Sequence, residues 1–237
     1  MKNIVLKSLI ILGACSFNLS ALTPQHLATD YKLDEHYSLV PNTAKNNQNV
    51  SDYYESECGK NPTVVEFFSY ACHGCLAAEP SFESYIKSKP KNVIFKRVPV
   101  VFNSGWDIVA KIYYTNDQLG VNDELHSKTF SWVKNTLSAN KPITADSVKD
   151  YISTMLAEPG LGEKLKSKFT VEEYLEVFKS PTVNRDYEKA NRYMRAYDIR
   201  STPTVIINNK YKVTLEKNTY DDLIKIINKL TTENTVC

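Results

Sequence analysis

The hydrophobic positions of this 237-residue chain change their spacing twice. Two apolar runs rich in β-branched residues, Val64–Phe68 and Val93–Val101, predict buried strands, and the segment between them has the spacing of a helix, with a kink expected at Pro80. A strand, a crossover helix and a second strand in one sheet make a right-handed unit, so we expect the two strands to be parallel. A shorter run, His36–Val40, predicts an edge strand.

From residue 103 to residue 198 the apolar spacing is helical. Residues that favour helix ends separate the first helices: Gly120, Lys141-Pro142 and Pro159-Gly160. Thr170 and Glu173 form a capping-box sequence, and Phe169 can pack on Tyr174, which predicts the start of a further helix. We therefore expect an all-helical block in the middle of the chain.

The strand spacing returns near the C-terminus. Pro203–Ile207 and Tyr211–Leu215 flank the turn signal Asn208-Asn209 and predict a hairpin, and an amphipathic helix follows as far as Leu230. The predicted class is α/β, with a mixed sheet in the order β-βα-β-[helical insert]-ββα. The expected parts are an N-terminal segment with the edge strand and a polar loop (22–61), a sheet domain (62–102 and 199–232) and the helical insert (103–198).

The first strand leads into Cys72-His73-Gly74-Cys75, just where the helical spacing begins. The first turn of a helix has unpaired N–H groups and the positive end of the helix dipole, and both stabilise a thiolate. We therefore expect Cys72 to be a nucleophile with a lowered pKa and Cys75 to be its partner in a redox-active disulfide, which needs no further cofactor. His73 can donate to the Cys72 sulfur or face solvent.

Two other uses of such a cysteine pair fit less well. Haem attachment requires a histidine directly after the second cysteine, and Leu76 stands there. A structural zinc site requires a second pair of ligands at a compatible spacing, and the remaining cysteines and histidines are scattered. We expect no bound metal.

Residues 1–21 have the pattern of a secretory signal, with Lys2 and Lys7 before a short apolar run. Cleavage after Ala21 would release the protein, whereas Leu12-Gly13-Ala14-Cys15 resembles a lipoprotein processing box that would leave Cys15 acylated. Removal of this segment leaves 27 basic and 27 acidic residues. The absence of a net positive charge argues against nucleic-acid binding.

Export would also place the remaining cysteines in an oxidising compartment. A second disulfide between Cys58 and Cys237 is then possible, and the alternative is two free thiols near mobile ends.

Charged residues occur within the predicted buried strands. Glu66 shares a face with Val64 and Phe68, and Lys96 shares a face with Ile94 and Val98. Because a buried charge is costly unless it is paired, we expect Glu66 and Lys96 to pair beneath the active-site helix. The alternative is that both reach solvent at an edge of the sheet.

The order of elements, the run from Glu66 to Cys72 and the sequence Ser201-Thr202-Pro203-Thr204 together resemble the thioredoxin fold with a helical insertion found in the DsbA-like periplasmic thiol oxidases. The resemblance covers about residues 37–230. It implies that Pro203 is a cis-proline facing the cysteines, that Thr202 and Pro203 hold a substrate segment as an added strand, and that Glu66 relays the proton of Cys75. Well-known members have Pro then His between the cysteines, so Gly74 replaces a histidine.

The resemblance implies an exported, monomeric thiol:disulfide oxidoreductase that donates its Cys72–Cys75 disulfide to unfolded exported proteins with thiols and is reoxidised by a DsbB-like membrane oxidase. A disulfide isomerase or reductase of the same fold is an alternative. So is a non-catalytic assembly factor of the cell envelope that holds a metal on the two cysteines.

Overall fold

The computed structural model describes residues 30–41, 61–103 and 105–233, and those from Tyr31 onward belong to one compact unit. The expected signal segment and most of the polar loop lie outside the described residues, as do Cys15, Cys58 and Cys237. Within the described ranges, no helix is both long and apolar enough to cross a membrane.

A five-stranded mixed sheet, in the order β1-β5-β4-β2-β3, holds the site. The central strand β2 (Thr63–Phe68) pairs in parallel with β3 (Ile94–Pro99) and antiparallel with β4 (Thr204–Ile207). Strand β5 (Tyr211–Thr214) forms the expected hairpin with β4, and the short β1 (Ser38–Leu39) pairs with β5 at the edge. The predicted mixed sheet is thereby confirmed.

The hairpin turn explains the register of β4 and β5. Asn208 and Asn209 have positive φ values of 52° and 51°. Asparagine tolerates this left-handed conformation better than most residues, and two such residues in succession match the twist of the paired strands. The turn signal in the sequence is therefore used as predicted.

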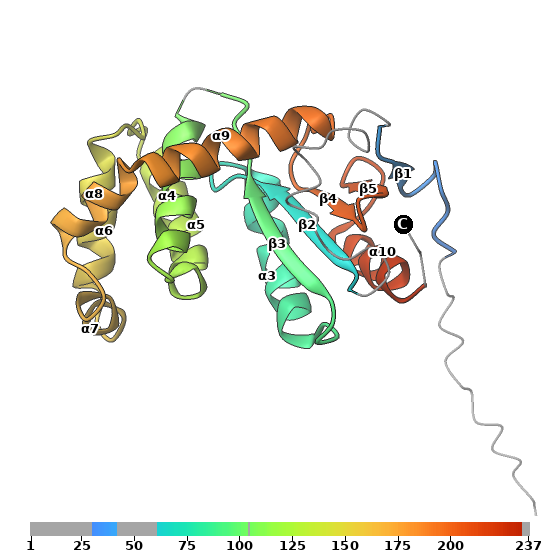
Figure 1. Cartoon of the computed structure of the whole chain (residues 1–237), viewed down its shortest axis with the longest axis horizontal. Helices are drawn as coiled ribbons and strands as arrows, with labels where there is room; N and C mark the ends of the chain where they lie inside the picture. Colours follow the sequence, from blue (N-terminus) through green and yellow to red (C-terminus); the bar gives the residue numbers. More distant parts are fainter. Residues whose placement is uncertain (1–29, 42–60, 104, 234–237) are drawn as a thin grey trace, which may run out of the picture. The chain divides into compact units, whose positions relative to one another are not determined.

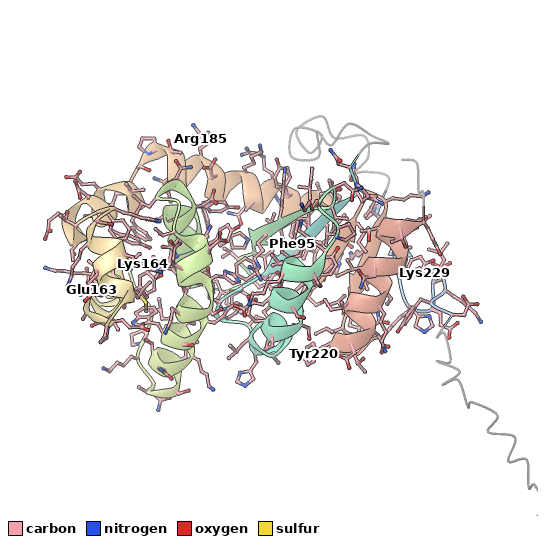
Figure 2. The ribbon with its side chains drawn as sticks, turned by 90° about the horizontal axis from the view of Figure 1, so that it is seen from below. Phe95, Glu163, Lys164, Arg185, Tyr220 and Lys229 are labelled. Carbon is pink, nitrogen blue, oxygen red and sulfur yellow. The ribbon has the colours of Figure 1, made fainter. Side chains whose placement is uncertain are left out.

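Helices cover both faces of the sheet (Figure 1). Helix α3 (His73–Ser88) and helix α10 (Tyr220–Thr232) pack on the face that carries Val64 and Val205. Phe95 of β3, labelled in Figure 2, contacts the ring of Phe82 on α3 at a centroid distance of 5.9 Å. The opposite face, with Val65 and Phe67, is covered by α9 (Pro181–Ala196).

The helical insert contains α9 and five helices before it. These are α4 (Trp106–Gln118), α5 (Asn122–Ser138), α6 (Ser147–Ala157), α7 (Leu161–Lys166) and α8 (Val171–Phe178). The capping box of Thr170 and Glu173 is present, and the rings of Phe169 and Tyr174 are in contact at 5.5 Å. The short α7 was not predicted.

The insert and the sheet share hydrophobic cores. Phe68, Tyr70 and Cys75 are buried in the same cluster as the apolar side chains of α4, α5, α6 and α8. Helix α9 extends from α8 to the sheet, as Figure 1 shows. The cysteine pair therefore lies where the insert packs against the sheet.

Candidate active site

Cys72 is the N-cap residue of α3, with an extended backbone (φ −91°, ψ 121°). Its Sγ accepts a hydrogen bond from the backbone N–H of Cys75 at 3.2 Å. A sulfur in this position satisfies one of the unpaired N–H groups of the first helical turn and lies at the positive end of the helix dipole. The helix begins where the sequence predicted, with the predicted nucleophile as its N-cap residue.

The pKa of Cys72 is lowered to about 6. The main cause is a hydrogen bond from the Cys75 thiol; bonds from Thr202 and from the backbone N–H groups of Cys75 and Gly74 act in the same direction, and partial burial opposes them. At neutral pH this group is therefore largely a thiolate, which is the form that attacks disulfides.

Cys75 is completely buried, and burial raises its pKa well above that of an ordinary thiol. The neighbouring Cys72 and the charge of Glu66 raise it further. Both cysteines are unbridged thiols in this structure. The pKa values of the two thiols thus move in opposite directions, and Cys72 is the more accessible of the two.

The loop before β4 faces the first cysteine. The Thr202–Pro203 peptide bond is cis, as the resemblance implied, and the Thr202 carbonyl lies 3.3 Å from Cys72 Sγ. In the thiol form, Cys72 donates to this carbonyl. Thr202 and Pro203 thus lie beside the reactive sulfur.

The two residues between the cysteines differ in position. His73 is the first residue of α3, and it is exposed. Gly74 faces the loop: a Cβ atom placed there would lie 3.5 Å from Pro203 Cδ, 3.6 Å from the Thr202 carbonyl oxygen and 3.8 Å from Cys72 Sγ. These are ordinary contacts, so a Cβ atom fits at this position.

The predicted pair of Glu66 and Lys96 is wrong: the partner of Glu66 is Arg97. Glu66 is fully buried, as expected, but Oε2 of its carboxylate binds Nε of Arg97 at 2.9 Å. The register of the parallel strands places Glu66 opposite Arg97, and Val65 opposite Lys96. Lys96 therefore belongs to the face covered by α9, where the charge of Lys189 and partial burial lower its pKa.

The error has a simple physical origin. Alternation within a strand shows which residues of that strand share a face. It does not show which residues of the neighbouring strand lie on the same face of the sheet. Strand β3 carries one cation on each of its two faces, Lys96 and Arg97. Only the register of the pair selects Arg97.

Arg97 extends the buried charge to α3 and the insert. Its NH2 group binds Glu79 Oε1 at 2.8 Å, while Glu79 Oε2 lies 3.3 Å from His126 Nε2. The other ring nitrogen of His126 lies 2.8 Å from the hydroxyl of Tyr70. Of this cluster, only Glu66 was predicted as a site residue from the sequence. The one local signal for the others is Glu79, which stands four positions after Cys75 and thus on the same side of the helix.

The ionisation of this cluster is set mainly by burial. Burial raises the pKa of Glu66, with Arg97 acting against it, and raises the pKa of Glu79 to about 7. Burial and the nearby Arg97 lower the pKa of His126 to about 3, so its ring is neutral at neutral pH. The contact between His126 and Glu79 is therefore a hydrogen bond and not an ion pair.

One atom of the cluster lacks a partner. Oε1 of Glu66 is buried and has no hydrogen bond to any described residue. An unpaired buried carboxylate oxygen costs free energy, and functional sites tolerate such costs. Among all the residues that the structure describes, no group of three or more His, Cys, Asp and Glu side chains is arranged to hold a metal ion.

The sequence is similar to curated proteins named thiol:disulfide interchange protein DsbA. The Burkholderia cepacia protein is 27% identical over 149 residues, which cover 63% of this chain and 64% of that protein. The Bordetella parapertussis protein is 28% identical over 184 residues, which cover 77% of this chain and 81% of that protein. The chain thus spans somewhat less than two thirds of the length of the Burkholderia relative. No family model matches.

Solved structures agree on the fold. A DsbA variant of Pseudomonas aeruginosa superimposes with a TM-score of 0.69 at 22% identity, covering 88% of this chain and all of that one. The oxidoreductase DsbA of Xylella fastidiosa superimposes with a TM-score of 0.67 at 22% identity, covering 85% of this chain and 96% of that one. By sequence this chain is similar to thiol:disulfide interchange proteins named DsbA, and it has the fold of the DsbA structures, a thioredoxin fold with a helical insertion.

Proposed function

We propose that this protein is an exported thiol:disulfide oxidoreductase that donates its Cys72–Cys75 disulfide to folding proteins. The observation that carries the proposal is the difference between the two thiols. Cys72 caps a helix and has a pKa lowered to about 6, whereas Cys75 is buried and its pKa is raised. Stabilisation of the Cys72 thiolate stabilises the reduced dithiol, which makes the disulfide a stronger oxidant.

The geometry supports attack at one sulfur. A substrate thiolate attacks Cys72 Sγ, the Cys72–Cys75 bond breaks, and Cys75 leaves with the electron pair and takes up a proton. A second substrate thiolate then attacks the substrate sulfur of the mixed disulfide and displaces Cys72 as a thiolate. The substrate has lost two electrons, and the enzyme has gained them. Because Cys75 is completely buried, the mixed disulfide forms at Cys72.

Glu66 is suited to handle the proton of Cys75. Burial raises its pKa, and its Oε1 is unpartnered among the described residues. When Cys75 leaves, Glu66 can supply a proton, and when Cys75 attacks, Glu66 can accept one. His73 is exposed and Lys96 belongs to the other face of the sheet, so neither supports this step.

The loop at Thr202 and Pro203 is suited to hold the substrate backbone. It immediately precedes β4 and lies beside Cys72 Sγ. An extended peptide added here would place a cysteine against Cys72, with main-chain hydrogen bonds giving affinity for many sequences. The substrates on this proposal are unfolded exported proteins with thiols.

The remaining parts of the proposal follow from the sequence and the resemblance. The signal pattern of residues 1–21 favours the periplasm, with or without an acyl anchor at Cys15. The redox-active disulfide serves as its own cofactor, a DsbB-like membrane oxidase restores it, and the protein acts as a monomer. A structural bridge between Cys58 and Cys237 belongs to the same set of expectations.

Gly74 favours a second candidate, a reductase or isomerase. It leaves open the space beside Cys72 Sγ, so the thiolate lacks the hydrogen-bond donor that a histidine at this position could supply. A less stabilised thiolate gives a less oxidising disulfide.

The redox equilibrium of the signal-free protein with glutathione, together with oxidation of a reduced, unfolded test protein, decides between these functions. An oxidase has a disulfide that glutathione reduces readily and introduces disulfides stoichiometrically. Preferential reshuffling of scrambled disulfides would instead favour the isomerase. If Cys72→Ser retains function while the reduced wild type binds metal, the redox proposal is wrong and the assembly-factor alternative stands.

A further inference from the structure

His126 connects the helical insert to both sides of the cysteine pair. It lies on α5, and its Nδ1 is 2.8 Å from the hydroxyl of Tyr70, two residues before Cys72. Its Nε2 is 3.3 Å from Oε2 of Glu79, four residues after Cys75 on the active-site helix. One imidazole therefore holds the loop that enters the site and the helix that leaves it.

The ring is enclosed by aromatic side chains. His126 is 5% exposed, and its ring centroid lies 5.2 Å from those of both Phe68 and Phe130. The hydrogen bonds that the ring makes to described residues go to Glu79 and Tyr70. Removal of the ring nitrogens would leave one oxygen of a buried carboxyl without its donor, which costs more than an ordinary hydrogen bond contributes.

An imidazole can satisfy Glu79 whether or not the acid is ionised. When Glu79 is a carboxylate, Nε2–H of His126 donates to it, and the Tyr70 hydroxyl donates to Nδ1. When Glu79 is protonated, its O–H donates to Nε2, and Nδ1–H donates to the Tyr70 oxygen. The change between these states needs only a tautomer shift and a rotation of the hydroxyl. A neutral ring is required, and burial keeps it neutral.

We propose that His126 is a positioning residue of the thiol chemistry: it keeps Glu79 hydrogen-bonded in both protonation states and so couples the helical insert to the charge beneath Cys75. The coupling runs from Glu79 through Arg97 to Glu66. The link to thiol exchange rests on the proposed function; the hydrogen-bond role does not.

Glu79 can exchange protons with solvent. Together with Arg97 and His126, it lines a cavity of about 960 Å³ formed between α3, β3, α4 and α5. Titratable and charged groups from each neighbouring element act on Glu79 or on His126: Glu66 of β2, Tyr70 of the loop, Glu83 of α3, Arg97 of β3, Tyr113 of α4 and Asp123 of α5. Of these, Arg97 donates a hydrogen bond to Glu79.

The test is a pH titration of Glu79 in the folded, disulfide-bonded protein. The infrared C=O stretch of the protonated carboxyl monitors its ionisation. The band is assigned by its loss in Glu79→Gln. In His126→Phe, which keeps an aromatic ring but neither donates nor accepts, both forms of Glu79 lose a hydrogen bond. The carboxylate loses the stronger one, because a hydrogen bond to a charged group is stronger than one between neutral groups, so we expect the midpoint to rise by about 1 pH unit. In His126→Gln, whose amide can donate to Glu79 and accept from Tyr70, the midpoint should stay close to that of the wild type.

Phe130→Leu is the matched control. It disturbs the packing around the ring without removing a hydrogen bond of Glu79. If this variant moves the midpoint as far as His126→Phe does, or if His126→Phe leaves it unchanged, His126 has a packing role only and the proposal is overturned. A band that persists in Glu79→Gln would overturn it as well.

A second readout separates this inference from the proposed function. The pH dependence of the equilibrium with glutathione should change slope near the Glu79 midpoint, and in His126→Phe this change should move with the infrared midpoint. If the infrared midpoint moves and the wild type does not oxidise thiols, the proposed function fails and the hydrogen-bond role stands. If thiol oxidation occurs and neither midpoint moves, the inference about His126 alone fails.

Discussion

Glu66 and Arg97 lie directly opposite each other in the parallel pair β2 and β3, and their side chains form an ion pair of 2.9 Å. The carboxylate is fully buried, and the guanidinium also binds Glu79 on the helix that carries Cys75. One cation thus compensates two buried acids beneath the cysteines. Arg97 is consequently the residue on which the charge balance of this site depends most.

Substitution of Arg97 by Met should be strongly destabilising, whereas Lys96→Met should not. The first change leaves two carboxyls buried without a cation and is expected to lower the free energy of unfolding by about 3–5 kcal/mol. Lys96 lies on the other face, partly exposed, and its loss should cost about 1 kcal/mol or less. Urea unfolding of the two variants measures both. Equal losses would contradict the observed register.

Glu79 should make stability fall as the pH rises. Its folded pKa of about 7 exceeds the ordinary 4.5, so between these values the folded state binds more protons than the unfolded state. Stability therefore decreases from about pH 4.5 to 7, by about 3 kcal/mol at most. Because His126 titrates with the opposite sign, we expect the effect in the difference between wild type and Glu79→Gln, measured on the oxidised proteins. A difference that does not vary with pH would rule out the raised pKa.

The two cysteines should differ when each is replaced. In Cys75→Ser, the thiolate of Cys72 remains and should trap substrates as mixed disulfides, whereas Cys72→Ser should trap none, since Cys75 is buried. Titration of thiolate absorbance in the reduced wild type should give a midpoint near 6 for Cys72. Non-reducing gels after incubation with a disulfide-bonded peptide show the trapped species, in which the thiolate of Cys72 has attacked the peptide disulfide and displaced a peptide thiolate. Adducts at Cys75 would refute the assignment.

A histidine at position 74 should make the disulfide more oxidising. The Cβ atom fits at 3.8 Å from Cys72 Sγ without displacing backbone, and an imidazole there can donate to the thiolate. We expect Gly74→His to lower the pKa of Cys72 and to shift the equilibrium with glutathione about tenfold or more toward the reduced enzyme. Gly74→Ala is the control for the added Cβ alone. If both variants behave alike, the imidazole has no part in the effect.

The sequence by itself determined what depends on neighbours along the chain. The apolar run of β2, the turn at Asn208-Asn209 and the capping box at Thr170 each follow from local residue preferences and are present in the structure. Cys72 at the start of a helix belongs to the same class, because two residues between cysteines and a change of apolar spacing are both local signals.

Tertiary structure alone decided which charges meet. Arg97 and not Lys96 faces Glu66 because the strands are aligned with residue 66 opposite residue 97, and register depends on the packing of the whole sheet. His126 lies 47 positions from Glu79 and 56 from Tyr70, with no local pattern to mark it. Hydrogen bonds between residues so distant in sequence arise only when the insert packs against the sheet, and that packing is set by the burial of apolar surface over many residues at once.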